Sequence, residues 1–114
     1  MEKILSELNK AGSGILGSMV VGEDGIPICT DFSTPINDEM VAALVSSITN
    51  SANKVIQKLT QGEMESFIIE TESNKIFLQN SRLGYLVILT NADANLGLVR
   101  VEMKTAAQRL NALA

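Results

Sequence analysis

Apolar residues recur along the chain at two spacings, and each change of spacing predicts a new element of secondary structure. Ile4, Leu5 and Leu8 recur at helical spacing in a short opening segment, which ends before Gly12-Ser13-Gly14. Residues 15–21 are almost entirely apolar, which predicts a strand covered on both faces.

A hairpin turn and a second strand are predicted next. Residues 22–25 read Gly-Glu-Asp-Gly, and the Asp-Gly pair supplies the positive φ that a tight turn requires. The second strand is expected over residues 26–32. Since Pro27 has no N–H to donate to a neighbouring strand, this strand is predicted to lie at an edge of the sheet.

The rest of the chain predicts a long helix, three strands and a closing helix. Asn37 is a suitable N-cap for a helix from Asp38 to Leu59, and Gln61-Gly62 ends it. Strands are expected over 65–71, 75–80 and 85–90, joined by short hairpin connections. The closing helix places one apolar stripe along its length: Leu96, Val99, Met103, Ala106, Ala107 and Leu110.

This order of elements predicts the fold class. A helix, a hairpin, a long helix, a three-strand meander and a final helix, with antiparallel connections throughout, are typical of an α+β fold. No linker, repeat or low-complexity segment divides the 114 residues, so residues 1–114 are expected to form a single domain.

The apolar arc of the long helix is unusually broad. One seam contains Val41, Leu44, Ile48, Ala52, Val55 and Leu59. Val45, Thr49 and Ile56 lie beside it and widen the arc to roughly 160°, whereas ~100° suffices for a helix that lies on one sheet. Either the helix is sunk deeply into its own core, or one flank contacts the sheet and the other a partner helix. We favour the second interpretation.

The opposite face of the long helix also favours a partner. It carries small uncharged polar residues and few charges, although Lys and Glu are better helix formers for a face that meets only water. Such residues cost little to desolvate, so this face is expected to be contacted. The predicted partner contacts are Glu39, Ser46, Asn50, Asn53, Lys54 and Gln57.

The strand over 65–71 also favours a partner. Phe67, Ile68 and Ile69 are consecutive, so neither face of this strand can be freely solvated. At a free edge its backbone would pair with the same strand of a second copy about a two-fold axis, unless Glu65, Glu70 and Glu72 protect a short edge. The predicted dimer interface is Val45, Ile48, Thr49, Ala52, Ile56, Phe67, Ile68 and Ile69.

Charge and composition narrow the classes of partner. The formal net charge is −4 and the basic residues are scattered singly, so neither nucleic acid nor an anionic membrane is an expected partner. The longest apolar run, residues 86–89, is too short to cross a bilayer. Cys29 is the single cysteine and the N-terminus has no apolar signal core, so we expect a cytoplasmic protein.

No catalytic, cofactor or metal site is predicted. The sequence has no histidine, and Cys29 has no base or second cysteine to activate it. Glycines at 12, 14 and 17 match GxGxxG formally, but here a strand follows the motif and none precedes it. The acidic residues Asp24, Asp31, Asp38 and Glu39 lack the spacing of a calcium loop, and no Walker sequence is present. The chain is therefore not expected to be an enzyme.

Two local motifs, taken with the order of elements, resemble a known family. Gly-Glu-Asp-Gly-Ile-Pro-Ile at 22–28 lies in the first hairpin, and Asn-Leu-Gly-Leu-Val-Arg at 95–100 opens the last helix. Over nearly its whole length the chain resembles the Roadblock/dynein light-chain family.

The resemblance implies an architecture and a function. A five-stranded antiparallel sheet would carry the long helix on one face and the terminal helices on the other, in a Roadblock/profilin-like architecture. Members form homodimers through the long helices and third strands, and MglB-type members of bacteria and archaea regulate a small Ras-like GTPase. The chain is thus expected to be a dimeric, non-catalytic GTPase regulator or scaffold. One alternative is a structural light-chain-like subunit of a motor or polarity assembly, without effect on nucleotide turnover. The other is a small-ligand sensor domain.

Overall fold

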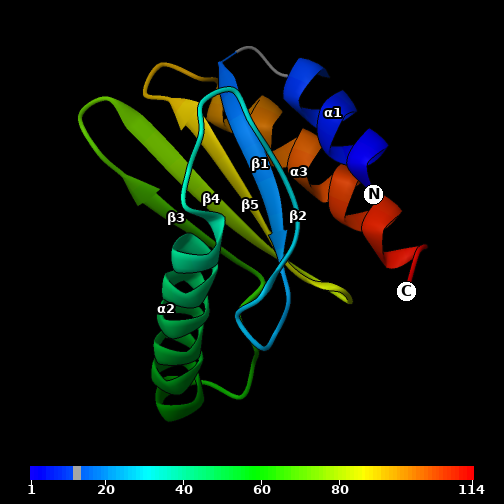
Figure 1. Cartoon of the computed structure of the whole chain (residues 1–114). Helices are drawn as coiled ribbons and strands as arrows, with labels where there is room; N and C mark the ends of the chain where they lie inside the picture. Colours follow the sequence, from blue (N-terminus) through cyan, green and yellow to red (C-terminus); the bar gives the residue numbers. More distant parts are fainter. Residues whose placement is uncertain (12–13) are drawn as a thin grey trace.

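The computed structural model describes residues 1–11 and 14–114, and it contains the elements that the sequence predicts, in the predicted order (Figure 1). The elements are α1 (Glu2–Ala11), β1 (Ile15–Val21), β2 (Pro27–Phe32), α2 (Asp38–Leu59), β3 (Ser66–Glu70), β4 (Asn74–Ser81), β5 (Gly84–Asn91) and α3 (Leu96–Asn111). The turn expected at Gly12–Ser13 lies outside the described residues.

The five strands form one antiparallel sheet in the order β2-β1-β5-β4-β3. The prediction from Pro27 that its strand lies at an edge is confirmed, because β2 stands at one end of the strand order, next to β1. The opposite edge is β3, which pairs with β4. Both edge strands therefore present one side of their backbone to whatever lies beside the sheet.

The helices cover the two faces of the sheet unequally. Figure 1 shows α1 and α3 side by side on one face and α2 alone on the other, which confirms the expected layers. The core on the α1/α3 side contains Ile4, Leu5, Leu8, Val20, Phe77, Leu86, Ile88, Ala94, Val99, Met103, Ala106 and Leu110. The core under α2 is half that size: Met19, Val21, Ala42, Val45, Leu78 and Val87. A single helix thus contributes only two fully buried side chains, Ala42 and Val45, to its apolar cluster.

Side-chain caps begin both long helices, as expected for Asn at these positions. The Oδ1 of Asn37 accepts a hydrogen bond from the N–H of Met40 at 3.2 Å, and Asn95 accepts one from Leu98 at 3.0 Å. These caps confirm the predicted starts of α2 and α3. The strand boundaries differ from the predicted ones by at most one residue; β2, for example, begins at Pro27 instead of Ile26. The pairing of β1 with β2 shifts register between Val20 and Val21, which pair with Cys29 and Pro27.

A polar bridge attaches α1 to the sheet. The buried hydroxyl of Ser18 donates to Asn9 Oδ1 at 2.7 Å, and Asn9 Nδ2 donates to the carbonyl oxygen of Asp31 at 2.9 Å. Asn9 therefore contacts both β1 and β2 and fixes the position of the helix over the edge of the sheet. Among the described residues, no helix is long and apolar enough to cross a membrane.

Candidate protein-interaction surface

Helix α2 lies on the sheet with only one flank of its apolar arc. Ala42, Val45 and Thr49 are its buried residues, with exposed fractions of 0%, 6% and 1%. The Thr49 hydroxyl donates to backbone carbonyl oxygens of its own helix, at 2.9 and 3.0 Å. The assignment of Val45 and Thr49 to a dimer interface was therefore wrong: both lie inside the subunit, because they are on the flank that the sheet covers.

The other flank of α2 is an exposed apolar stripe. Its large side chains are Met40, Leu44, Ile48, Val55 and Leu59, with exposed fractions of 59%, 57%, 36%, 57% and 79%. At 100° per residue they span an arc of about 100°, centred well away from the buried flank. We call these five residues the α2 stripe. A stripe of this kind on a monomeric protein marks an interaction site.

Only part of the α2 stripe was named in advance as an interface. Ile48 is one of the residues expected at the dimer interface, whereas Met40, Leu44, Val55 and Leu59 are exposed here without having been assigned to it. Three of the four belonged to the seam found in the sequence. The breadth of the apolar arc indicated that part of α2 would be exposed, but it did not indicate which flank would contact the sheet.

A groove joins the stripe to strand β3. Ser47, Ile48, Ser51, Ala52, Val55 and Phe67 line a cavity of about 350 Å³ between α2 and this edge strand. Ala52 and Ile56, both predicted interface residues, are half-buried. Ala52 lines the groove, whereas Ile56 lies on the adjoining flank of the helix. The groove thus brings together side chains from the helix and the strand that the sequence analysis had selected separately.

Strand β3 places half-buried side chains on both faces of the sheet. Phe67 packs against the core under α2, whereas Ile68 packs against the core on the α1/α3 side. Ile69 is also half-buried, and the strand lies at the edge on which its predicted pairing depended. With apolar side chains on both faces and an unpaired backbone edge, β3 is suited to continuation by another strand.

The polar face of α2 is only partly available to a partner. Glu39, Asn50, Lys54 and Gln57 are exposed, as expected for contact residues, and Ser46 is half-buried beside the β1–β2 turn at Gly25.

The structure gives Asn53, one of the expected partner contacts, a hydrogen bond within the subunit. This residue is half-buried, and its Oδ1 accepts a hydrogen bond from the N–H of Met64 at 3.2 Å. Met64 itself is 4% exposed. The Asn53 carbonyl therefore serves to fix the loop that leads into β3, which periodicity alone could not indicate.

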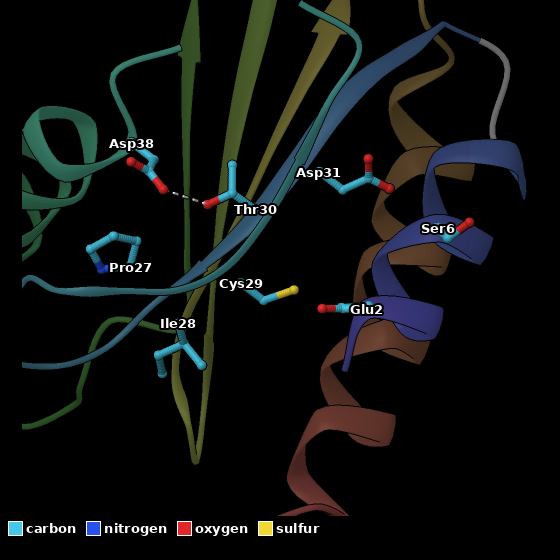
Figure 2. Close-up of a pocket in the computed structure, with 8 residues that line it drawn as sticks. All are labelled: Glu2, Ser6, Pro27, Ile28, Cys29, Thr30, Asp31 and Asp38. Atoms are coloured by element: carbon cyan, nitrogen blue, oxygen red, sulfur yellow. Dashed lines mark hydrogen bonds between the residues drawn. The ribbon is translucent and has the colours of Figure 1, made fainter. Parts of the chain in front are cut away.

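A cavity along the β2 edge does not resemble a ligand pocket. It measures about 550 Å³ and is lined by residues of α1, β2 and the start of α2. Figure 2 shows that Cys29 and Asp31 point towards Glu2 and Ser6 of α1, whereas Thr30 points the other way and donates a hydrogen bond to Asp38 at 3.3 Å. The lining side chains belong to opposite faces of one edge strand, so the hollow follows the edge and does not enclose a ligand.

Cys29 has the environment of a structural cysteine. It packs half-buried against the core on the α1/α3 side, and its burial raises the pKa of the thiol above the ordinary value. Nearby Glu2 raises the pKa further, so the thiol is protonated at neutral pH and is a poor nucleophile. Among the described residues, no group of three His, Cys, Asp or Glu side chains is arranged to hold a metal ion.

The sequence and the fold of the chain were compared with those of known proteins. The sequence profile of the Roadblock/LC7 domain matches residues 1–90. The chain belongs to the Roadblock/LC7 family. The uncharacterized protein MJ1340 of Methanocaldococcus jannaschii is 38% identical to this Roadblock chain over 113 residues, which cover 99% of the chain and 98% of that protein.

Solved structures share the Roadblock fold at low sequence identity. A Roadblock/LC7 domain from Streptomyces avermitilis has a TM-score of 0.92 at 16% identity and covers 99% of this chain and 96% of its own. Myxococcus xanthus MglB has a TM-score of 0.92 at 18% identity and covers 98% and 92%. Profilin II of Acanthamoeba castellanii, with a TM-score of 0.69 at 11% identity over 96% and 97%, shows that the architecture is also profilin-like.

Proposed function

We propose that this Roadblock chain forms a two-fold homodimer through the α2 stripe and the edge of β3, and that the dimer binds and regulates a small Ras-like GTPase. The observation that carries the proposal is the exposed α2 stripe, which continues through the groove at Phe67 to an unpaired strand edge. A second copy placed about a two-fold axis would cover the stripe with its own stripe and pair β3 with β3.

The distribution of side chains along α2 favours an antiparallel crossing of the two helices. The small residues Ser47 and Ser51 lie in the middle of the stripe and allow close approach of the two backbones. The first turn of α2 is acidic, with Asp38 and Glu39, and its last turn carries Lys58. An antiparallel pair therefore brings helix ends of opposite charge near one another, whereas a parallel pair brings ends of like charge together.

The polar strip of α2 is the surface that we assign to the GTPase. Glu39, Asn50, Lys54 and Gln57 remain exposed on a face of the helix that turns away from the stripe, so a dimer would present this strip twice. The likeness to the Roadblock family supports a Ras-like GTPase as partner. Since such a partner works with cytoplasmic GTP, we place the protein in the cytoplasm.

The chemistry available to the chain limits how it could act on a GTPase. It has no histidine, and the arginines Arg82, Arg100 and Arg109 all lie outside α2. We therefore propose that the dimer repositions the switch residues of the GTPase itself and supplies no arginine finger from the α2 strip.

Two measurements test the proposal separately. Sedimentation equilibrium should give at least the mass of a dimer, and a monomer at several hundred micromolar would refute the dimer. Titration into a Ras-like GTPase encoded in the same genome and loaded with a non-hydrolysable GTP analogue should show saturable binding. Asn50→Lys should weaken this binding at least about ten-fold because it places a long charged side chain in the strip, whereas the exposed Gln108→Lys on α3 should not.

The rate of GTP hydrolysis then separates regulator from scaffold. A change in hydrolysis or nucleotide exchange on saturation with the dimer would support regulation. Binding without either change would instead make the chain a structural, light-chain-like subunit. Binding to neither nucleotide state would remove the GTPase from the proposal while leaving the dimer intact.

A further inference from the structure

A second apolar surface lies at the end of the sheet where the hairpins turn. The turns between β1 and β2 and between β4 and β5 lie at the same end, because Ser81 pairs with Gly84 and Val21 with Tyr85 in the sheet register. Between them is a groove of about 420 Å³, lined on the apolar side by Ile26, Ile28 and Leu83. None of these residues belongs to α2.

The groove is exposed and carries opposite charges on its two rims. Ile26 and Ile28 are 60% and 48% exposed, which is unusual for isoleucines beside a well-packed core. Glu23 and Asp24 line the rim formed by the first turn, and Arg82 lines the rim formed by the second. A segment that fits this groove must therefore present an apolar ridge with a base on one side and an acid on the other.

The first turns of α3 have this combination of side chains. Leu98 and Val101 form an apolar ridge and are 42% and 61% exposed. At 100° per residue, Lys104 lies about 60° to one side of Val101 and Glu102 about 40° to the other side of Leu98. Lys104 is exposed and Glu102 half-buried. The chain thus carries both a groove and a ridge whose flanking charges are complementary.

The groove and the ridge lie at opposite ends of the molecule. Helix α3 begins after β5 has crossed the sheet away from the hairpin turns, so its first turns lie at the far end (Figure 1). One copy cannot place its own ridge in its own groove. A contact between these surfaces must join two copies head to tail, and such a contact leaves a free groove at one end and a free ridge at the other.

We propose that a second copy of this chain docks its α3 ridge into the hairpin-end groove, with Lys104 facing Glu23 and Asp24, and Glu102 facing Arg82. This heterologous contact is separate from the two-fold α2 contact and would link subunits or dimers into larger assemblies. Its small apolar area and exposed charges make it a weak contact that salt weakens further.

Complementation between two variants tests the contact directly. Ile26→Asp places a carboxylate among the apolar side chains of the groove, and Val101→Asp places one on the apolar ridge. Each variant alone should associate at least about ten-fold more weakly than the wild type. An equimolar mixture should regain association, because one variant keeps an intact ridge and the other an intact groove. Thr34→Asp, in the exposed loop before α2, adds the same charge elsewhere and should have no effect.

A charge exchange adds an independent readout. Lys104→Glu should weaken assembly, and Glu23→Lys in the same chain should restore it; Glu23 is used because Asp24 Oδ1 accepts a hydrogen bond from the N–H of Ile26 within the turn. Mass should be followed by sedimentation equilibrium from ten to several hundred micromolar at low and high salt.

The possible results separate this contact from the α2 dimer. If the wild type keeps one mass over the whole range, or if the mixture of variants fails to regain association, the head-to-tail contact does not exist. A failure of the α2 contact would instead lower the basic unit from dimer to monomer while the variants still complement each other.

Discussion

Two adjacent residues of α2 provide the sharpest test of how this helix is used. Leu44 is 57% exposed in the α2 stripe, whereas Val45 is 6% exposed on the sheet. Full burial of a leucine side chain is worth about 1.5–3 kcal/mol, so roughly half of that remains for Leu44 to gain in a dimer. Because a dimer contains two copies, Leu44→Ala should cost it about 2–3 kcal/mol and raise the dissociation constant roughly 30- to 150-fold.

The neighbouring substitution should have the opposite profile. Val45→Ala removes two methyl groups from a buried site and leaves a cavity, at a cost of about 2 kcal/mol in the stability of the subunit. It should leave the dissociation constant within about three-fold of the wild type, since Val45 does not reach the stripe.

Sedimentation equilibrium gives the dissociation constant, and urea unfolding gives stability at matched protein concentration, because the stability of a dimer depends on concentration. An unchanged dissociation constant in Leu44→Ala, or equal changes in both variants, would show that the flank of α2 assigned to the partner is the wrong one.

Four further substitutions test the interior and the surface of the subunit. Asn9→Ala should lower the free energy of unfolding, measured in urea, by about 1–3 kcal/mol because it leaves the buried Ser18 hydroxyl without a partner. Adding Ser18→Ala should recover part of this loss. No recovery would exclude this explanation. Gly84 has a φ of +136°, and a Cβ there would lie 2.0 Å from a backbone oxygen of β1. Gly84→Ala should therefore abolish the circular dichroism spectrum of the folded protein. A native spectrum would contradict this. The hydrogen bond from Arg109 lowers the pKa of Glu7, so the small stabilisation by this exposed pair should be present at neutral pH and lost as the pH falls through that lowered pKa. The melting temperatures of Glu7→Gln and wild type should therefore differ slightly at neutral pH and low salt and converge in acid; a difference that grows in acid would reverse the sign of the argument.

Much of the fold followed from local patterns. The cap at Asn37, the turn at Gly25 and the edge position of Pro27 each depend on the chemistry of a few neighbouring residues, and each was confirmed. The breadth of the apolar arc on α2 likewise followed from periodicity. It predicted correctly that one subunit leaves part of this helix uncovered, which the 57% exposure of Leu44 bears out.

The flank of α2 that meets the sheet was decided only by the tertiary structure. A broad helical arc is symmetrical about its middle, so spacing alone cannot distinguish Val45, which is buried, from Leu44, which is exposed. The tertiary structure also decided two other features: the hydrogen bond between Asn53 and Met64, and the groove between the two hairpin turns. Each joins residues of different elements, whose contact spacing within one element cannot predict. Sequence periodicity measures how much of an element is apolar, whereas the packing of the whole sheet determines which part of that surface remains for another molecule.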